Sequence, residues 1–397
     1  MLTPAEAEAA IAAALPAAAS ERIPIADCAG RVLREAVHAE RDAPPFDRVT
    51  MDGIAIACRA LARREFRLAG TQAAGTPALS LPDDSDCFEV MTGAVLPRGC
   101  DTVVPVEKLR MANGHAEIDA AWTPVRGQFV HRQAADAAAG DPLLAPGTRL
   151  GAPEIAIAAS AGRDALEVSR RPRIAVVSTG DELVEPGAPI ATHQVRRSNA
   201  YGLAAALRLA GFAPVTDCHL ADDRAAIEAA LAAALDQHDV IVLSGGVSAG
   251  RFDHVPAALA AVGVRQLFHH VAQRPGRPMW FGVREPDRAV FALPGNPVSV
   301  LVCLARYVIP ALTTQSGAPC PVRVPVSLAR EFDFPAPLTC FLPVALRYDR
   351  DGRTWAEPRP TGGSGDFISL AGTDGFVELP PGPATHPAGL AVPFQRW

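Results

Sequence analysis

The pattern of apolar and polar positions divides the chain into segments of different character. Near the N-terminus, Thr3, Pro4 and Glu6 supply the cap, the first-turn proline and the capping-box glutamate of a helix that should end before Pro16. From residue 44 to about residue 127, short apolar runs are separated by Gly, Pro and Asp, which predicts a small all-β module.

Residues 173–312 follow a different pattern, in which short apolar runs alternate with helical periodicity. This alternation predicts a parallel, doubly wound sheet whose ligands bind beyond the carboxyl ends of the strands. After Gly317 the chain returns to short β-like runs separated by turns. The predicted elements are strands at residues 174–177, 239–243 and 290–293, and helices at residues 153–161, 199–209, from about 222 through 231, and after residue 295.

Composition narrows the class of protein. The 397 residues are 49% hydrophobic and 20% charged with a net charge of −6, which disfavours disorder and a nucleic-acid-binding face. At about 150 residues per domain, the length indicates two to four domains. The eight cysteines form no C-x-x-C pair, so a disulfide framework and a zinc ribbon are disfavoured and a reducing cytoplasm is indicated. No apolar run reaches the roughly 18 residues of a membrane span without a charge or proline.

A glycine turn follows the second predicted strand of the α/β region. Gly245 and Gly246 allow the backbone to approach a ligand closely, and their N–H groups can bind an anion. Ser248 adds a hydroxyl, and Asp253 adds a carboxylate able to hold Mg²⁺ beside a phosphate. An ordinary strand-to-helix turn is an equally good interpretation of this segment taken alone.

Two further turns end strands at the same predicted edge of the sheet. In the turn that begins at Leu293, Asn296 suits a helix N-cap and Pro297 the first helical position, which would leave free N–H groups for an anion. In the turn that begins at Ser178, Asp181 and Glu182 offer carboxylates for a metal or a ribose hydroxyl. A simply capped helix and a solvated acidic turn are the alternatives.

Other residues are candidates because their loops are restricted. Arg274 and Arg277 flank a Pro-Gly turn, so two guanidiniums are held close together for a tetrahedral oxyanion, although exposed arginines more often belong to a soluble surface. A Pro-Pro-stiffened loop leads to Asp52. The His269–His270 pair is interpreted as structural, because neighbouring side chains of a strand point to opposite faces. The sequence has no P-loop, which disfavours a P-loop kinase or ATPase.

In this order, the motifs resemble the molybdopterin molybdotransferase family, known as MoeA in bacteria and as the E domain of gephyrin in animals. The resemblance spans nearly the whole chain. It rests on residues 44–53 (PPFDRVTMDG), 91–104 (MTGAVLPRGCDTVV), 178–183 (STGDEL), 198–203 (SNAYGL), 244–253 (SGGVSAGRFD), 274–278 (RPGRP), 293–299 (LPGNPVS) and 363–375 (GSGDFISLAGTDG).

The resemblance implies a multidomain α/β plus β fold and an elongated homodimer. A discontinuous helical-β segment would comprise residues 1–43 and 138–170, and an inserted β domain residues 44–137. A three-layer α/β molybdopterin-binding domain would span residues 171–316, and a C-terminal β domain residues 317–397. In the family the site lies between the α/β domain of one subunit and the inserted β domain of the other.

The implied reaction inserts molybdate into adenylylated molybdopterin and releases AMP and molybdenum cofactor, with Mg²⁺ as cofactor. Two alternatives stay open, a molybdopterin-binding scaffold and a hydrolase, and tungstate is a possible oxyanion. Molybdenum-enzyme maturation factors are possible partners. Matched to the family, the catalytic positions are Asp52, Thr92, Asp222, Arg274 and Arg277; the cofactor-binding positions are Thr179, Gly180, Gly245, Gly246, Ser248, Pro294, Gly295, Asn296 and Pro297; and the metal-binding positions are Glu182 and Asp253.

Some positions depart from the family pattern. The usual Lys is Arg277, the usual Asp before Ser198 is Arg197, and the usual Tyr after Asp-Gly is Ile54. Residues 127–137 stand where the family reads close to GQNIRRRGEDI, and they lose its Asn, Gly and Glu at Phe129, Ala134 and Ala135.

Overall fold

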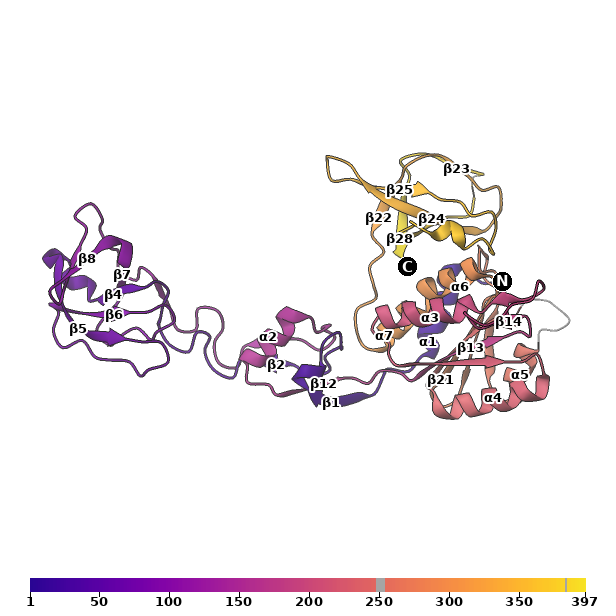
Figure 1. Cartoon of the computed structure of the whole chain (residues 1–397), viewed down its shortest axis with the longest axis horizontal. Helices are drawn as coiled ribbons and strands as arrows, with labels where there is room; N and C mark the ends of the chain where they lie inside the picture. The colour runs from indigo at the N-terminus through magenta and orange to yellow at the C-terminus, as the bar shows by residue number, and fades with distance from the viewer. Residues whose placement is uncertain (248–253, 383) are drawn as a thin grey trace. The chain divides into compact units, whose positions relative to one another are not determined.

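The computed structural model describes residues 1–247, 254–382 and 384–397, and the chain forms two compact units (Figure 1). Unit 1 comprises Met1–Arg34, Pro146–Leu150 and Leu166–Trp397. Unit 2 comprises Glu35–Ala145 and Gly151–Ala165.

Unit 1 contains a six-stranded sheet with the strand order β16-β13-β17-β21-β20-β18. The first four strands are parallel, which confirms the parallel arrangement predicted for β13, β17 and β21. β20 pairs antiparallel with both β21 and β18. The sequence pattern did not predict β18 or β20. Three residues join β20 to β21, too few for a crossover. The strands are β13 (Ile174–Thr179), β16 (Val215–Leu220), β17 (Val240–Ser244), β18 (Arg265–His269), β20 (Trp280–Arg284) and β21 (Arg288–Leu293).

Helices cover both faces of this sheet, giving three layers. Along β13, Ile174 and Val176 face one apolar core, whereas Ala175 and Val177 face another, as the period of two in a strand requires. The first core is closed by α1 (Pro4–Ala14), α3 (Ser198–Leu209), α6 (Pro297–Cys303) and α7 (Ile309–Gln315), and the second by α4 (Arg224–Gln237) and α5 (Val255–Ala261).

The helix caps largely follow the sequence prediction. The capping box at Thr3 and Glu6 is present, with the Glu6 N–H donating to Thr3 Oγ1 at 3.3 Å. α4 is capped by Asp223, whose carboxylate accepts from the Ala226 N–H at 2.8 Å, so this helix begins two residues later than predicted.

Among the described residues, one helical segment is long and apolar enough, by length and composition, to cross a membrane. It runs through Pro297–Gln315 and includes a π-helical turn at Leu304–Val308 between α6 and α7. Within the described chain, 72% of its most apolar window is buried, and its side chains fill the first core. We therefore assign it as a core helix of unit 1.

The C-terminal strands close into a barrel. β24 pairs with both β25 and β26, which completes a ring through β22 and β28. β19 (Gln273–Arg274) adds a parallel pairing to β24, with Arg274 opposite Cys340, so the loop that carries the two candidate arginines is attached to the barrel. The barrel strands are β22 (Pro325–Leu328), β24 (Thr339–Tyr348), β25 (Thr354–Pro358), β26 (Gly375–Leu379) and β28 (Ala391–Arg396).

Unit 2 is mainly β structure, as predicted for residues 44–127. Its six-stranded sheet has the order β7-β4-β6-β5-β9-β8, and a single α-helix, α2 (Ala152–Ser160), confirms the helix predicted at residues 153–161. The sheet strands are β4 (Gly53–Ile56), β5 (Glu65–Gln72), β6 (Asp86–Val90), β7 (Thr102–Pro105), β8 (Leu109–Ala112) and β9 (His115–Ile118). Two shorter pairings join β3 (Arg48–Val49) to β10 (Val130–His131), and β2 (Val37–His38) to β11 (Pro142–Leu144).

A buried charge network connects the barrel to the helices of unit 1. The Arg306 side chain is 2% exposed and lies in the π-helical turn, where its Nη1 donates to Glu8 at 2.9 Å and its Nε to Glu378 at 3.0 Å. Arg323 binds the same two carboxylates, at 2.6 Å and 3.4 Å. Four charged groups, from α1, the core helix, the segment before β22, and β26, therefore neutralise one another around the buried Arg306.

We expect Arg306→Met to lower the free energy of unfolding by about 3 kcal/mol, because two carboxylates would lose their most buried partner. Arg330→Met is the matched control, since Arg330 is 59% exposed and pairs with Glu357 at 3.0 Å. Its effect should stay below about 1 kcal/mol. Urea denaturation measures both values, and equal effects would contradict a structural role for the buried network.

Candidate functional site

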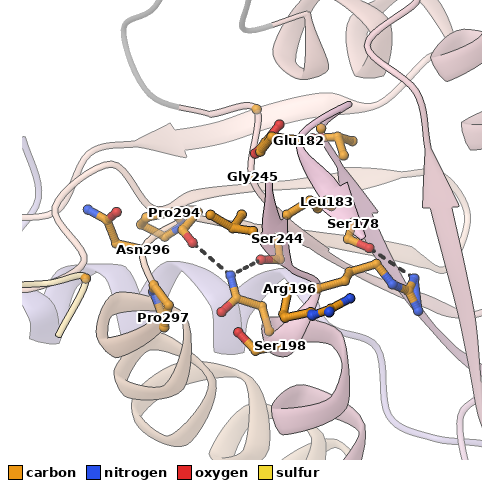
Figure 2. A pocket seen from close by; sticks show the side chains of 18 of the residues that line it. Ser178, Glu182, Leu183, Arg196, Ser198, Ser244, Gly245, Pro294, Asn296 and Pro297 are labelled. Atoms are coloured by element: carbon orange, nitrogen blue, oxygen red, sulfur yellow. Dashed lines mark hydrogen bonds between the residues drawn. The ribbon is translucent and has the colours of Figure 1, made fainter. Parts of the chain in front are cut away.

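A cavity of about 670 Å³ opens at the carboxyl ends of β13, β17 and β21 (Figure 2). This is the edge at which a parallel sheet presents its ligand-binding turns. Most of the sequence-predicted residues line it: Thr179, Gly180, Glu182, Asp222, Gly245, Gly246, Pro294, Gly295, Asn296 and Pro297. Ser248 and Asp253 lie outside the described residues.

The glycine turn after β17 is shaped by its neighbours. Gly246 has φ +68°, and a Cβ built there would lie 2.5 Å from Cγ2 of Val255 and 3.2 Å from Oγ1 of Thr179. Any larger residue at this position would therefore combine a left-handed backbone with a steric clash. Both glycines line the cavity, but the Gly245 N–H donates to the Leu293 carbonyl at 3.1 Å, so the prediction that this N–H is available to an anion was wrong.

Asn199, which was not among the predicted site residues, ties two of the strand ends together. Its Nδ2 donates to Ser244 Oγ at 2.9 Å and to the Gly295 carbonyl at 2.8 Å. One amide in the first turn of α3 thus fixes the spacing between the turns after β17 and β21. The signal available in the sequence was its place in SNAYGL at residues 198–203, beside the other motifs.

The carboxylates of the cavity come from the loops after β13 and β16. The Asp222 N–H donates to Asp181 Oδ1 at 3.1 Å, which couples the two loops. The Glu182 carboxylate lies against the α-carbon face of Gly180, so close that a Cβ there would be 2.5 Å from Glu182 Oε2. Among the described residues, no three His, Cys, Asp or Glu side chains converge as a complete metal site.

The N-terminus of α6 differs from the prediction of free N–H groups. Asn296 is the N-cap residue, but its Nδ2 donates to Ser364 Oγ at 2.7 Å instead of its side chain capping the helix. The Val298 N–H donates to the Ser364 carbonyl at 3.0 Å. The prediction was wrong for this amide because a loop from the C-terminal barrel supplies the acceptor that a helix terminus needs.

The candidate arginines line a second cavity, of about 630 Å³, which shares Pro278, Pro294 and Asn296 with the first. Arg274 and Arg277 are exposed and both line its wall. Between them, Gly276 has φ +90°, and a Cβ there would lie 2.6 Å from Sγ of Cys303. The backbone of this short loop is therefore seated closely on the core helix.

Asp52 and Thr92 lie in unit 2, whereas the other predicted site residues within the described chain lie in unit 1. Asp52 Oδ1 accepts hydrogen bonds from the Thr92 N–H at 2.6 Å and from Thr92 Oγ1 at 2.7 Å. These two bonds, that of the backbone first, lower the pKa of the Asp52 carboxyl. Thr92, 40 positions further along the chain, thus holds the ionised Asp52 carboxylate in place.

Arg197, where the family pattern has Asp, lies in the wall of the first cavity and is 4% exposed. Its guanidinium donates to Ser178 Oγ at 3.2 Å and forms an ion pair with Asp217. Its Nε lies 2.8 Å from the Glu185 carboxylate, which also accepts from the Tyr201 hydroxyl at 2.9 Å. The carboxylates of Glu185 and Asp217 therefore offset the positive charge of the guanidinium that stands where the family pattern has Asp.

The interpretation of His269 and His270 as pointing to opposite faces was wrong. His270 follows β18 with φ +77°, which turns its ring back onto that of His269, and the ring centroids are 3.9 Å apart. His269 Nε2 lies 3.0 Å from the Val247 carbonyl, beside the glycine turn. Burial, and then the neighbouring charge of His269, lower the pKa of His270.

Two of the three departures in residues 127–137 fall at backbone positions with a left-handed conformation. Phe129 has φ +56° and Ala134 has φ +60°. The family pattern has Asn and Gly at these positions, which are the residues that adopt left-handed conformations most readily. This chain therefore carries strain that the pattern avoids.

Ala134→Gly is expected to stabilise unit 2 by roughly 0.5–1 kcal/mol. Glycine avoids the energetic penalty that alanine has in the left-handed conformation, but it loses more conformational entropy on folding, which offsets part of the gain. Ala135→Gly is the matched control, because the backbone φ of Ala135 is not positive. This control should destabilise by a similar amount. Differential scanning calorimetry measures both, and stabilisation by both variants would show that strain at residue 134 is not the cause.

Comparisons with known proteins agree with this architecture. Three family models match the chain in succession: MoeA N-terminal region (domain I and II) at residues 2–162, a probable molybdopterin binding domain at residues 175–314, and MoeA C-terminal region (domain IV) at residues 325–397. The fold is thus that of the molybdopterin-binding class of proteins. The chain belongs to the MoeA family.

Relatives in this family are similar over almost their entire length. A molybdopterin molybdenumtransferase of Synechocystis sp. is 44% identical over 371 residues, covering 93% of each chain. One of Bacillus subtilis is 30% identical and covers 94% of this chain and 89% of its own. The crystal structure of a molybdopterin biosynthesis MoeA protein from Pyrococcus horikoshii is 27% identical, with a TM-score of 0.81 and coverage of 100% and 99%.

Proposed function

We propose that this protein is a molybdopterin molybdenumtransferase that inserts molybdate into adenylylated molybdopterin and releases AMP and molybdenum cofactor. The observation that carries the proposal is the pair of cavities that share Asn296, one lined by glycine turns and the other by two guanidiniums. A phosphorylated organic substrate and a compact dianion require these two environments side by side. The names of the relatives support the same activity.

In the first cavity, the turns at Gly245–Gly246 and Pro294–Gly295 would bind the pterin and its phosphate through their backbone, with Thr179 and Gly180 alongside. Asn199 would hold the turns at the spacing that the substrate needs. Ser248, named from the sequence, would add a hydroxyl donor. Positioning supplies much of the rate in such a reaction, because the protein contributes no covalent step.

In the second cavity, Arg274 and Arg277 would bind molybdate. Guanidiniums are always charged and offer paired donors, which suits a tetrahedral dianion. The seating of Gly276 on the core helix keeps both side chains on one short loop. Tungstate has the same charge and shape, so this part of the site would also admit it.

The residues present fit a magnesium ion. Mg²⁺ in nucleotide sites is usually held by one or two carboxylates together with substrate phosphates, and Glu182 and Asp222 line the first cavity. Asp253, named from the sequence, would be a further ligand. When bound, Mg²⁺ would neutralise charge on the phosphoanhydride of the adenylylated substrate. Asp222, held by its backbone bond to Asp181, would keep its carboxylate oriented toward that group.

We further propose a cytoplasmic homodimer in which Asp52 and Thr92 of one subunit serve the site of the other. The resemblance to the family supports this arrangement, and the fixed, ionised Asp52 group has no packing role that explains it. Eight free thiols in the described chain agree with a reducing compartment. Molybdenum-enzyme maturation factors would then receive the product.

The reaction itself is the first test. Incubation with adenylylated molybdopterin, Mg²⁺ and molybdate should release AMP only when molybdate is present. We expect Arg274→Ala and Arg277→Ala each to raise the molybdate concentration for half-maximal rate by roughly tenfold or more, because each removes a charge-assisted contact. Arg350→Gln, an exposed arginine of the barrel, is the control and should leave the rate unchanged.

Each alternative function gives a different result in this assay. Substrate binding without AMP release would indicate a scaffold protein, and AMP release without molybdate would indicate a hydrolase. Normal molybdate dependence in both arginine variants would contradict the assignment of the second cavity.

Mixing inactive variants tests the shared site. At a molybdate concentration well below the half-maximal value of the wild type, Asp52→Ala and Arg274→Ala should each have little activity alone. After denaturation and joint refolding in equal amounts, about a quarter of the wild-type rate should return, because half the dimers are mixed and each holds one intact site. An absence of recovery, with refolding of the wild-type chain as the control, would mean that each subunit uses its own Asp52.

A further inference from the structure

Four arginines surround a small cavity of unit 1 that is distinct from the two cavities of the proposed site. Arg31, Arg149, Arg170 and Arg171 line it, together with the turn after α3 at residues 210–212. We call this the arginine pocket. Its residues do not overlap those of either cavity described above.

The arginine pocket is built on well-fixed backbone. The Gly30 N–H donates to the Leu150 carbonyl and the Leu150 N–H to the Arg31 carbonyl, both at 2.8 Å. The Ser169 N–H donates to the Val32 carbonyl, also at 2.8 Å. Segments far apart in the sequence are thus joined where the arginines project, which pre-organises the cluster.

The positive charge of the pocket exceeds the negative charge that faces it. Within the part of the chain that the structure describes, no Asp or Glu lines the cavity. Arg170 reaches Asp239 at 3.1 Å, but that carboxylate also binds Arg173 at 3.0 Å and Arg288 at 3.5 Å. Arg288 also pairs with Asp287, so among the described residues it is Arg170 and Arg173 that share the single carboxylate of Asp239.

Arg31 has an unused donor inside the protein. The residue is 8% exposed, and its Nη2 binds Glu21 and the Ser169 carbonyl, the latter at 2.7 Å. Its Nε is buried and has no hydrogen-bond partner in the described chain. A buried N–H of a charged group without a partner is costly, so an acceptor is missing from this position.

Arg149 and Arg171 lack carboxylate partners. Arg149 donates only to the Gly30 carbonyl, at 3.2 Å, and Arg171 makes no ion pair or side-chain hydrogen bond with the described residues. Burial lowers the pKa of Arg171, and the charges of Arg31 and Arg149 lower it further, with Glu21 opposing them. The guanidiniums thus repel one another across the pocket.

We propose that the arginine pocket binds a compact tetrahedral oxyanion, such as phosphate, sulfate or molybdate. The cavity is small, which leaves no room for a nucleotide base. An oxyanion there would accept from the unpaired Arg31 Nε and neutralise Arg149 and Arg171. It would also connect segments on which the fold of unit 1 depends.

The test uses the full-length protein with Arg274→Ala and Arg277→Ala, so that the second cavity does not contribute. We expect phosphate, sulfate or molybdate to raise the thermal unfolding midpoint relative to chloride at the same ionic strength. Calorimetric titration of the same protein with each anion gives the dissociation constant. Comparison of the three anions identifies which one the pocket prefers.

Arg149→Gln and Arg171→Gln, added to this background, should each weaken binding by roughly tenfold, because each removes a charge-assisted contact while leaving the buried Arg31 in place. Arg350→Gln is the matched control and should bind as the parent does. The inference is overturned if the parent protein binds none of the three anions. It is also overturned if the two pocket variants bind as tightly as the control. Circular dichroism verifies that every variant is folded.

Discussion

One amide of Asn199 sets the geometry on which the candidate site depends. It bonds the turns after β17 and β21 at once, so the glycine segments of two parallel strands cannot move independently. The Gly245 N–H also donates to the Leu293 carbonyl at 3.1 Å, so the backbone joins the two turns as well as this side chain. The same edge gathers the acidic loops after β13 and β16, because parallel strands bring their carboxyl ends together. Topology brings the groups near, and the Asn199 side chain adds two hydrogen bonds to the backbone bond that sets the spacing of the turns.

Much of this arrangement could be predicted from the sequence. β13, β17 and β21 are continuous apolar runs, which a strand buried on both faces requires, and the turns that follow them carry the cavity-lining glycines. β16 was missed because its Thr, Asp and His interrupt the apolar pattern at one edge of the sheet. β20 was not predicted because it forms a hairpin with β21. β13, β17 and β21 were predicted from the alternation of strands and helices, and no helix separates β20 from β21.

The parts that escaped prediction depend on contacts between distant segments. No local pattern indicates that Ser364 accepts from the first free N–H of α6, or that Asp217 and Glu185 balance Arg197. His270 shows the same limit at short range, because its left-handed backbone reverses the side-chain direction that a strand would impose. Local periodicity specifies elements and faces, whereas the partner of each polar group is set by the tertiary structure.

The pairing of β19 with β24 makes the barrel part of the surface that we propose binds the oxyanion. Arg274 is opposite Cys340 in a parallel ladder, so the register of a barrel strand determines which way the arginine side chain points. A one-residue slip in β24 would turn that guanidinium away from the cavity without altering the loop sequence. In a chimaera that takes its C-terminal barrel from a homologue, residues 273–278 would therefore have to come from the same homologue as the barrel.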